Sequence, residues 1–462
     1  MSRRTVVGSL LVVALVTAGA FVATGGLGPG SPAAASVPSS SLVPSGLSAA
    51  TNSAAPSATA APASSASPAP SPTPSAGPSA SPAPGQTGVA VSPTLAKRLQ
   101  KALDRYATAN RLPGTSVTVT WPDGRSWTGT SGYADVKAGR AVTADTLFPI
   151  ASMSKTFTSA LILGLVEDRK LSLDARVSAL LPTVRLGTPG KPIPTAITVR
   201  MLLDHTSGLA DYFFGKGIDK DLMAARGATW TADRALTYVG KPLGKPGRSW
   251  HYSNTNYLLL GLIAEHVGKA PFATLVRERL LGPAGLKDAY VQVAEKPRGP
   301  LALGYYYNSP SRAAAPVGLA DSRRTVVPFT SVITAAGPAG NVASTSADLA
   351  RWARALYGGS LLTPAMLALA VGDAKATAPY RPYVAYGLGV QVTRIDGHRA
   401  YGHSGRFIGV RGELRYLPGP GLAIAVLTNQ NGVDLRPLTA RLVSLALPKP
   451  PATPAASPSP SP

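Results

Sequence analysis

The sequence predicts a mixed α/β fold, in which one β-sheet is assembled from distant segments and a helical region is inserted between them. Three observations predict this arrangement: a hairpin pattern near residue 120, a second hairpin pattern near residue 420, and helical segments that dominate residues 145–290. Strands near both ends of the folded region with helices between them favour one shared sheet. The sequence shows no internal repeat.

Helices are predicted at the beginning and at the end of the folded region. The stretch "TLAKRLQKALDRYATANRL" and the stretch near residue 440 both carry large apolar or aromatic residues every three or four positions. This spacing places them on one face of a helix, which then packs on a core. The residues concerned are Leu95, Leu99, Leu103 and Tyr106 in the first stretch, and Leu435, Leu438, Leu442 and Leu445 in the second.

Two hairpins are predicted in the sequence between these two helices. In "TSVTVTWPDGRSWTGTSGYAD" the residues Val117, Val119 and Trp121 alternate with polar residues before a Pro-Asp-Gly turn at 122–124. Alternation followed by such a turn is typical of a half-buried hairpin. In "GVRGELRYLPGPGLAIAVLTNQ" the turn at 418–421 separates two further strand patterns.

The chain begins with a predicted export signal. Arg3 and Arg4 precede an apolar run over 6–22, and the small residues 33–35 suit a signal peptidase. Because a membrane-spanning helix needs roughly 20 apolar residues, the run lies between a cleaved signal peptide and a retained anchor. We predict a signal peptide or signal anchor over 1–36, with cleavage favoured, and a location outside the cell, either secreted or on the membrane or wall. The paired arginines are compatible with the twin-arginine route and with general secretion.

A long segment without charge follows the signal. No charged residue lies between Arg4 and Lys97, and the stretch consists mainly of Ala, Ser, Pro, Gly and Thr. Such a composition offers too little apolar surface to offset the entropy of ordering, so a disordered linker is predicted over 37–92. A similar tail is predicted over 448–462, which leaves 93–447 as the folded domain. The chain has no Cys, which excludes disulfides, a cysteine-linked lipid anchor and a thiol nucleophile.

The net charge of +23 points to an anionic partner. Removing Arg3, Arg4 and Lys449 leaves +20 on the folded region. Nucleic-acid binding is disfavoured because the basic residues are scattered, without a dense run interleaved with aromatic residues, and because export separates the protein from DNA. An anionic cell envelope fits better, and a solvated basic surface without a partner remains the alternative.

The residue pair Ser152 and Lys155 indicates nucleophilic catalysis. A serine hydroxyl needs a neighbouring base to attack at neutral pH. On a helix, positions three apart share a face, so the lysine can reach the serine oxygen. Desolvation lowers the pKa of a lysine and lets it accept a proton, and the helix N-terminus stabilises negative charge on the attacked carbonyl. The pattern alone is weak, because a serine and a lysine at this spacing also occur by chance on solvated helices.

Two later motifs supply complementary groups. In "WHYSNTNY" the phenol of Tyr252 can relay a proton to a leaving group, and the amide of Asn254 can hold both the lysine and a substrate. The structural alternative is a polar turn with Ser253 or Asn254 as a helix N-cap. In "YGHSGRFIG", His403 and Gly405 lead into a strand, and a small residue there lets a substrate lie along the strand edge. The alternative is a glycine-rich turn with a surface histidine.

The order Ser-x-x-Lys, Tyr-Ser-Asn, His-Ser-Gly resembles the penicillin-recognising serine hydrolases. This family contains class C type β-lactamases, serine D,D-carboxypeptidases, and related esterases and D-amino-acid peptidases. The resemblance extends over about 97–447 and includes the blocks "GYADVKAGRAVTADTLFPIASMSKTFTSALILGLVEDRKLSLD", "ITVRMLLDHTSGL", "WHYSNTNYLLLGLIAEHVG", "AGPAGNVASTSADLARWARAL" and "AVLTNQ". It implies an α/β (α+β) fold with an antiparallel sheet flanked by helices, an all-helical domain beside it, and an active site between the two.

The resemblance also implies a role for each matching residue. The implied catalytic residues are Ser152 as nucleophile, Lys155 as base or charge partner, and Tyr252 as proton shuttle. The implied substrate-binding residues are Asn254, His403, Gly405 and Arg406, and the backbone N–H groups of Ser152 and Arg406 would form the oxyanion hole. The implied reaction is acyl transfer through an acyl-serine intermediate, on a small peptide, β-lactam or ester.

The third motif departs from the Lys-Thr-Gly form of many β-lactamases. A histidine is mostly neutral at pH 7, which weakens capture of a β-lactam carboxylate, although the charge of the adjacent Arg406 offers a substitute. The His-x-Gly form resembles the D,D-carboxypeptidase and esterase side of the family. We therefore expect a D-alanyl-D-alanine carboxypeptidase acting on peptidoglycan stem peptides, with a β-lactamase or carboxylesterase as the alternative. A penicillin-binding sensor or envelope-binding module without turnover is the alternative from another class.

No cofactor or metal ion is expected. The five histidines show no metal-ligand spacing, and no glycine-rich phosphate loop follows a strand in a convincing context. His205 in "LLDHTSGL" is expected to structure a loop near the site rather than to take part in the chemistry.

Overall fold

The computed structural model describes residues 90–307, 316–319, 327–372, 374–377 and 385–448. The predicted signal (1–36), nearly all of the predicted linker (37–92) and nearly all of the predicted tail (448–462) lie outside the described residues. These three assignments therefore stay predictions.

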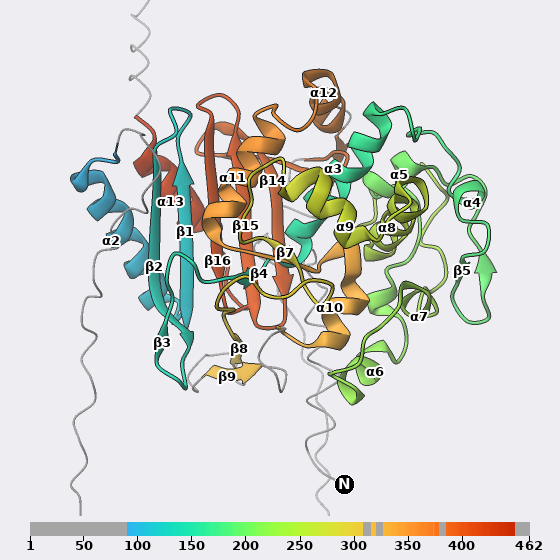
Figure 1. Ribbon diagram of the computed structural model, residues 1–462, viewed down its shortest axis with the longest axis horizontal. Helices are drawn as coiled ribbons and strands as arrows, with labels where there is room; N and C mark the ends of the chain where they lie inside the picture. The colour runs from blue at the N-terminus through green and yellow to red at the C-terminus, as the bar shows by residue number, and fades with distance from the viewer. Residues whose placement is uncertain (1–89, 308–315, 320–326, 373, 378–384, 449–462) are drawn as a thin grey trace, which may run out of the picture. The chain divides into compact units, whose positions relative to one another are not determined.

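The centre of the molecule is a nine-stranded antiparallel sheet in the order β11-β12-β13-β14-β15-β16-β1-β2-β3. Figure 1 shows the first strands of the folded region beside the last ones. The strands are β1 (Gly114–Thr120), β2 (Ser126–Asp135), β3 (Arg140–Ala141), β11 (Lys375–Ala376), β12 (Ala385–Tyr386), β13 (Gln391–Ile395), β14 (His398–Phe407), β15 (Val410–Leu417) and β16 (Leu422–Thr428).

The pairing of β1 with β16 confirms the prediction of a sheet built from distant segments. Val117 lies opposite Val426 at this junction. Both predicted hairpins are also confirmed, because β1 pairs with β2 across the turn at 122–124 and β15 pairs with β16 across the turn at 418–421. The first strand, β1, thus pairs with the last strand, β16, in the interior of the sheet.

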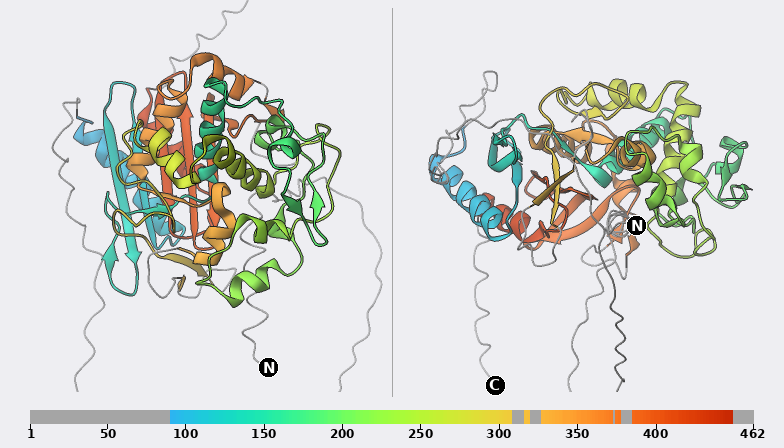
Figure 2. Two further views of the ribbon diagram at one scale, coloured as in Figure 1. Left: turned by 45° about the vertical axis from the view of Figure 1, so that its right-hand side comes forward. Right: turned by 90° about the horizontal axis from the view of Figure 1, so that it is seen from below.

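The predicted terminal helices, α2 (Pro93–Ala109) and α13 (Arg436–Ala446), cover one face of the sheet (Figure 2). Their apolar stripes are buried in one cluster with the inward side chains of β1 and β16, as the three-to-four spacing predicts. The members include Leu99, Leu103, Leu438, Leu442, Val117, Val119, Ile424 and Val426. On the other face, α11 (Ser346–Tyr357) packs on β1, β15 and β16.

The remaining elements form the predicted helical region and short strand pairs. The helices are α3 (Ser154–Glu167), α4 (Val177–Leu180), α5 (Val199–Leu203), α6 (Ile218–Ala224), α7 (Ala232–Leu236), α8 (Asn254–Gly268), α9 (Phe272–Val276), α10 (Thr330–Ala336) and α12 (Pro364–Gly372). The short helical turns are η1 (Ala151–Met153), η2 (Tyr212–Phe214), η3 (Arg277–Leu281) and η4 (Gly337–Ala339). The minor sheets pair β4 (Phe148–Pro149) with β10 (Val342–Ser344) and β7 (Tyr290–Val291), β5 (Arg185–Leu186) with β6 (Lys191–Pro192), and β8 (Gly304–Tyr307) with β9 (Pro316–Leu319).

Helix α3 joins the sheet region to the helical region. Most of its residues are buried, because it packs on α8 as well as on β14. The Phe157 ring stacks on Trp352 of α11 at 4.0 Å between centroids, and the Trp352 indole donates a hydrogen bond to Thr156 at 2.9 Å. A helix fixed on all sides in this way gives its N-terminal turn a defined position.

Among the described residues, no single helix is long and apolar enough to span a membrane. Helix α8 and the segment Phe272–Leu281 are together long and apolar enough for a span, but the two parts are bent by 81° relative to each other. Most residues of α8 are buried inside the protein.

Candidate active site

Ser152 lies in the 3-10 turn η1, immediately before α3, and its residue is 7% exposed. The turn is fastened to β10: Ile150 donates its backbone N–H to the carbonyl of Val342 at 3.0 Å, and Ser154 Oγ accepts the N–H of Val342 at 3.1 Å. The hydroxyl therefore lies at the N-terminal end of a buried helix, where free N–H groups and the helix dipole favour negative charge.

Lys155 is fully buried and its amine contacts Ser152. Its Nζ donates hydrogen bonds to Ser152 Oγ at 3.2 Å, to Asn254 Oδ1 at 2.7 Å and to the carbonyl of Ala339 at 2.9 Å. Burial lowers the pKa of Lys155 to about 7, and the nearby carboxylate of Asp211 opposes that shift. A substantial fraction of the amine is therefore neutral at physiological pH and able to accept a proton.

Asn254 connects Lys155 to a buried carboxylate that the sequence did not reveal. The amide Nδ2 of Asn254 donates to Asp211 Oδ2 at 2.7 Å, and its backbone N–H donates to the same oxygen at 3.0 Å. Asp211 Oδ1 accepts the N–H of Phe213 at 3.0 Å. Asp211 thus closes the N-terminal ends of both α8 and η2 and orients the amide that holds the lysine. Burial raises the pKa of Asp211, and these hydrogen bonds oppose the rise.

The N-terminus of α8 also differs from the sequence alternative of a Ser253 or Asn254 cap. Ser253 is the N-cap residue, yet its side chain makes no capping hydrogen bond. Asn254 is the first helical residue, and its side chain faces Lys155 and Asp211. The only sequence signal for Asp211 is a lone acidic residue in "SGLADYFF", before two apolar rings.

Tyr252 borders the same amine. Lys155 Nζ lies 5.0 Å from the centroid of the Tyr252 ring and 5.3 Å from that of Tyr257. Ser152 and Lys155 thus lie within one helical turn, and the Tyr252 ring and the Asn254 amide, about a hundred residues further along the chain, also border the Lys155 amine. The roles expected of these four residues stay predictions.

His205 holds the segment that carries Tyr252. Its Nδ1 accepts the backbone N–H of Ser253 at 3.2 Å and lies 3.0 Å from Asn256 Nδ2, while its carbonyl accepts the N–H of His251 at 2.9 Å. The imidazole lies 4.3 Å from the Tyr252 ring between centroids. Burial, with Lys155 as a smaller cause, keeps the pKa of His205 well below its ordinary value, so the ring is neutral.

His403 is buried and engaged by protein groups. Its Nδ1 donates to the carbonyl of Ser404 at 2.6 Å, so its Nε2 accepts from the hydroxyl of Tyr386 at 3.0 Å. Burial, assisted by the charge of Lys155, lowers the pKa of His403 to about 3. The histidine of the third motif is therefore a neutral group that positions Tyr386, a residue that the sequence analysis did not single out.

Gly405 has a structural reason besides the expected substrate contact, which stays a prediction. A Cβ at this position would lie 2.1 Å from the carbonyl oxygen of Ile150 and 3.2 Å from Met153 Cε. The space that a side chain would fill is thus taken by the turn that carries Ser152. Gly405 allows η1 to lie directly on β14.

Arg406 lies opposite Arg411, one residue along from Gly405, and successive side chains of a strand leave the backbone toward opposite faces. The Arg406 side chain therefore starts on the face opposite to that of Gly405, and the expectation that its charge serves the site stays a prediction. Burial and the neighbouring Arg411 lower the pKa of Arg406 to about 10, which leaves it cationic at neutral pH.

Among the described residues, the ladder between β13 and β14 stops at Gly402. The pairing of β13 with β14 ends at Gln391 opposite Gly402, and the N–H of Ser404 donates to the side-chain oxygen of Gln391 at 2.9 Å. Alternate N–H groups of a strand point to the same edge, so the N–H of Arg406 points the same way as that of Ser404.

Within the described residues, no three acidic or histidine side chains gather closely enough to hold a metal ion.

Comparisons with known proteins identify the family of the chain. Residues 99–447 match the Beta-lactamase family. Penicillin-binding protein 4 from Amycolatopsis lactamdurans is 30% identical over 341 residues, which cover 71% of this chain and 84% of that protein. Esterase EstB from Burkholderia gladioli is 30% identical over 244 residues, 51% of this chain and 60% of that protein, less than two thirds of its length.

Solved structures give the same answer for the fold. D-amino acid amidase from Ochrobactrum anthropi SV3, complexed with L-phenylalanine amide, matches with a TM-score of 0.65 and 27% identity, over 76% of this chain and 98% of that one. The predicted antiparallel sheet with helices is thereby confirmed as the fold of this family. The chain belongs to the Beta-lactamase family and is a serine hydrolase related to the penicillin-binding proteins.

Proposed function

We propose that this protein is an exported hydrolase that works through an acyl-serine intermediate on Ser152. The observation that carries the proposal is the contact of 3.2 Å between the Lys155 amine and Ser152 Oγ, made by a lysine whose pKa burial lowers to about 7. A base with a pKa near the working pH combines availability with strength.

In the proposed acylation, neutral Lys155 takes the proton of Ser152 while the serine oxygen attacks a substrate carbonyl. The bond from that carbonyl to the leaving nitrogen or oxygen then breaks, and the phenol of Tyr252 passes its proton to the leaving group and regains one from the protonated Lys155. Water afterwards attacks the acyl-serine ester, which releases the acid and restores Ser152. The placement of both Ser152 and the Tyr252 ring around the Lys155 amine supports this division of roles.

The tetrahedral intermediate needs donors for its oxyanion. The proposed donors are the backbone N–H of Ser152, at the start of a buried helix, and that of Arg406, on β14. Two preorganised N–H groups are the usual arrangement for stabilising such an oxygen.

The proposed substrates are peptides whose scissile bond follows a D-amino acid residue, with D-alanyl-D-alanine stem peptides as the first to test. One observation favours a second candidate, the amides or esters of D-amino acids. His403 is neutral, so it supplies no cation for a substrate carboxylate. The likeness to D-amino acid amidase supports the same candidate.

A fluorescent penicillin tests the intermediate. We expect covalent labelling of the wild-type protein and none of Ser152→Ala, while Ser126→Ala, which alters an exposed serine of β2, labels as the wild type does. Equal labelling of the wild type and Ser152→Ala would remove the proposal.

Turnover assays then rank the substrates. A D-alanyl-D-alanine peptide, the amide of D-phenylalanine and a nitrophenyl ester are compared by kcat/KM under one buffer condition. If the peptide has the highest kcat/KM, the result supports a carboxypeptidase. If the amide or the ester has the highest kcat/KM, it supports the second candidate. Labelling that is never released, without turnover of any of the three, would identify a penicillin-binding sensor and contradict the hydrolase.

A further inference from the structure

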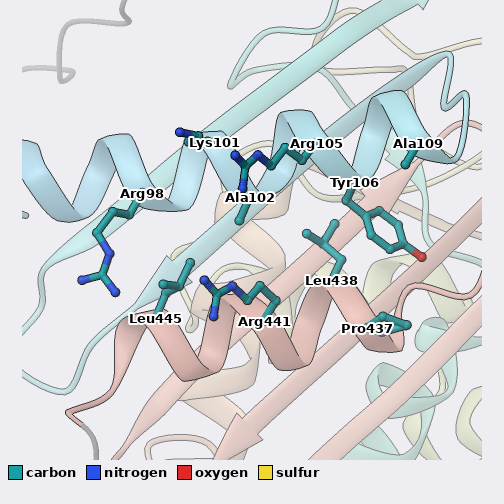
Figure 3. A pocket seen from close by; sticks show the side chains of 10 residues that line it. All are labelled: Arg98, Lys101, Ala102, Arg105, Tyr106, Ala109, Pro437, Leu438, Arg441 and Leu445. Carbon is teal, nitrogen blue, oxygen red and sulfur yellow. The ribbon is translucent and has the colours of Figure 1, made fainter.

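A basic groove lies between α2 and α13, on the face of the sheet away from Ser152 (Figure 3). Its volume is about 410 Å³, within the range of small-molecule sites. Ten residues line it: Arg98, Lys101, Ala102, Arg105, Tyr106 and Ala109 from α2, and Pro437, Leu438, Arg441 and Leu445 from α13.

The cationic residues of the groove form a stripe. Arg98, Lys101 and Arg105 are separated by three and four positions on α2 and therefore share one side of that helix. Figure 3 shows Arg98 of α2 and Arg441 of α13 extending toward the space between the helices. All four basic residues are exposed.

These four charges are not neutralised by neighbouring carboxylates. None of the four forms an ion pair with a carboxylate within the described part of the chain. The nearby Asp104 accepts a hydrogen bond from Gln100, and Asp434 pairs with Arg436 at 2.6 Å. The positive field of the groove is therefore available to an external anion, and the net charge of the chain strengthens it.

The floor between the charges is apolar. Leu438 and Leu445 are buried at this floor, and Ala102 borders it. Tyr106 donates its hydroxyl to the carbonyl of Asp434, and its ring forms a side wall of the groove. A hydrophilic polyanion would leave this apolar strip unused. An anion that carries hydrocarbon next to its phosphate satisfies both parts of the groove.

We propose that the groove between α2 and α13 binds the phosphate headgroups of anionic lipids at a bilayer surface. The four cations hold the phosphates, and the strip of Ala102, Leu438 and Leu445 takes the first carbons of an acyl chain. Because the groove and Ser152 lie on opposite faces of the sheet, a protein bound in this way turns its candidate active site away from the bilayer. The inference does not depend on the proposed hydrolytic activity.

Vesicle flotation of the full chain tests the groove. The probes are vesicles of phosphatidylcholine alone and vesicles with equal amounts of phosphatidylcholine and phosphatidylglycerol. The readout is the difference between the two, because the apolar run over 6–22 would insert into both alike. We expect binding to the anionic vesicles that weakens as salt rises from about 0.1 M to about 1 M.

Two matched variants locate the binding. The groove variant combines Arg98→Gln, Lys101→Gln, Arg105→Gln and Arg441→Gln, and the control combines Lys137→Gln, Lys191→Gln, Lys287→Gln and Lys296→Gln, four exposed lysines elsewhere. Each basic residue near an anionic surface contributes a factor of about five, so the groove variant should bind two to three orders of magnitude more weakly. The control should lose much less. Equal losses in both variants would show that net charge alone acts and would overturn the proposal.

Two further measurements sharpen the result. Ala102→Glu places a carboxylate on the apolar floor and should reduce vesicle binding while the circular dichroism spectrum and the urea unfolding midpoint are unchanged, which shows an intact fold. Soluble polyphosphate, added at the same ionic strength as a sodium chloride control, should displace the protein no better than the salt does. Strong displacement by polyphosphate would instead identify a binding site for a soluble polyanion and refute the lipid assignment.

Discussion

Replacing Asp211 by Asn should move the pH profile of acylation toward lower pH. In the proposed mechanism Lys155 acts in its neutral form, so kcat/KM of the wild type should fall as the pH drops through about 7, the pKa of that amine. Burial lowers this pKa, while the charge of Asp211 raises it. Removing the charge therefore lowers the pKa of Lys155 further, and the variant keeps a neutral amine in more acidic solution.

The size of the shift follows from the geometry. One amide group separates the two charges, with contacts of 2.7 Å from Lys155 to Asn254 and 2.7 Å from Asn254 to Asp211, so the charges lie about 7 Å apart. At an effective dielectric constant of about 20, two unit charges at about this distance interact by roughly 2 kcal/mol. The acid limb should therefore move by about one to two pH units, since one pKa unit is about 1.4 kcal/mol.

The same substitution should also destabilise the fold. The Asp211 carboxylate accepts three hydrogen bonds, whereas an asparagine side chain offers one acceptor oxygen and brings two donors that have no partner there. A cost of about 1–3 kcal/mol is expected, measured by urea unfolding.

The assay is the rate of penicillin labelling from about pH 5 to about pH 9, in constant ionic strength, for the wild type, Asp211→Asn and the surface control Asp233→Asn. The control removes one exposed charge and should leave the profile unchanged. An acid limb at the same pH in Asp211→Asn and in the wild type would refute the coupling. A rate that falls as the pH rises through 7 would refute Lys155 as the base, because it would require the charged amine.

Two other predictions concern the sheet beneath the site. Gly405→Ala should lower the labelling rate by more than tenfold, because its Cβ would lie 2.1 Å from a backbone oxygen of the turn that carries the serine; Gly372→Ala, with no atom within 4 Å, is the control. Glu413 and Arg415 form a buried ion pair at 2.5 Å. Glu413→Ala should therefore lower the free energy of unfolding by about 3–5 kcal/mol, whereas a fully apolar replacement of both residues should restore much of it. Urea unfolding checks this pair, and a loss below about 1 kcal/mol would contradict the burial argument.

Local patterns were enough to predict most of the fold. The stripes of α2 and α13 and the turns of the two hairpins are properties of about ten to twenty consecutive residues, and periodicity reads them directly. The presence of both hairpins in one sheet could be predicted because each hairpin needs further strands to pair with. The order of the nine strands could not be predicted, since strand register and strand neighbours depend on contacts between distant parts of the chain.

The candidate site was predictable where motifs carry it. Ser152, Lys155, Tyr252 and Asn254 could be predicted as site residues because their residue types and order are distinctive. Asp211 was not predicted, because its role comes from its position between the N-terminal ends of α8 and η2. Nothing in the local sequence marks that junction.

Burial gives the site an unusual charge balance, which bears on how the reaction is promoted. Lys155, His205 and His403 are all shifted toward the neutral form. In the proposed acylation the proton taken by Lys155 creates a cation at the moment the substrate oxygen becomes an anion, so their attraction exists in the transition state and not in the ground state. Interactions of that kind lower the barrier, whereas those present throughout do not.

Asp211 then sets a compromise between two requirements. A lower pKa of Lys155 leaves more amine neutral, but a weaker base accepts the proton of Ser152 less readily. Without the carboxylate, the acid limb moves to lower pH and the plateau at high pH should fall, so the profiles of the wild type and Asp211→Asn should cross. A variant that is merely damaged would be slower at every pH. Crossing profiles thus separate tuning of the base from simple loss of structure.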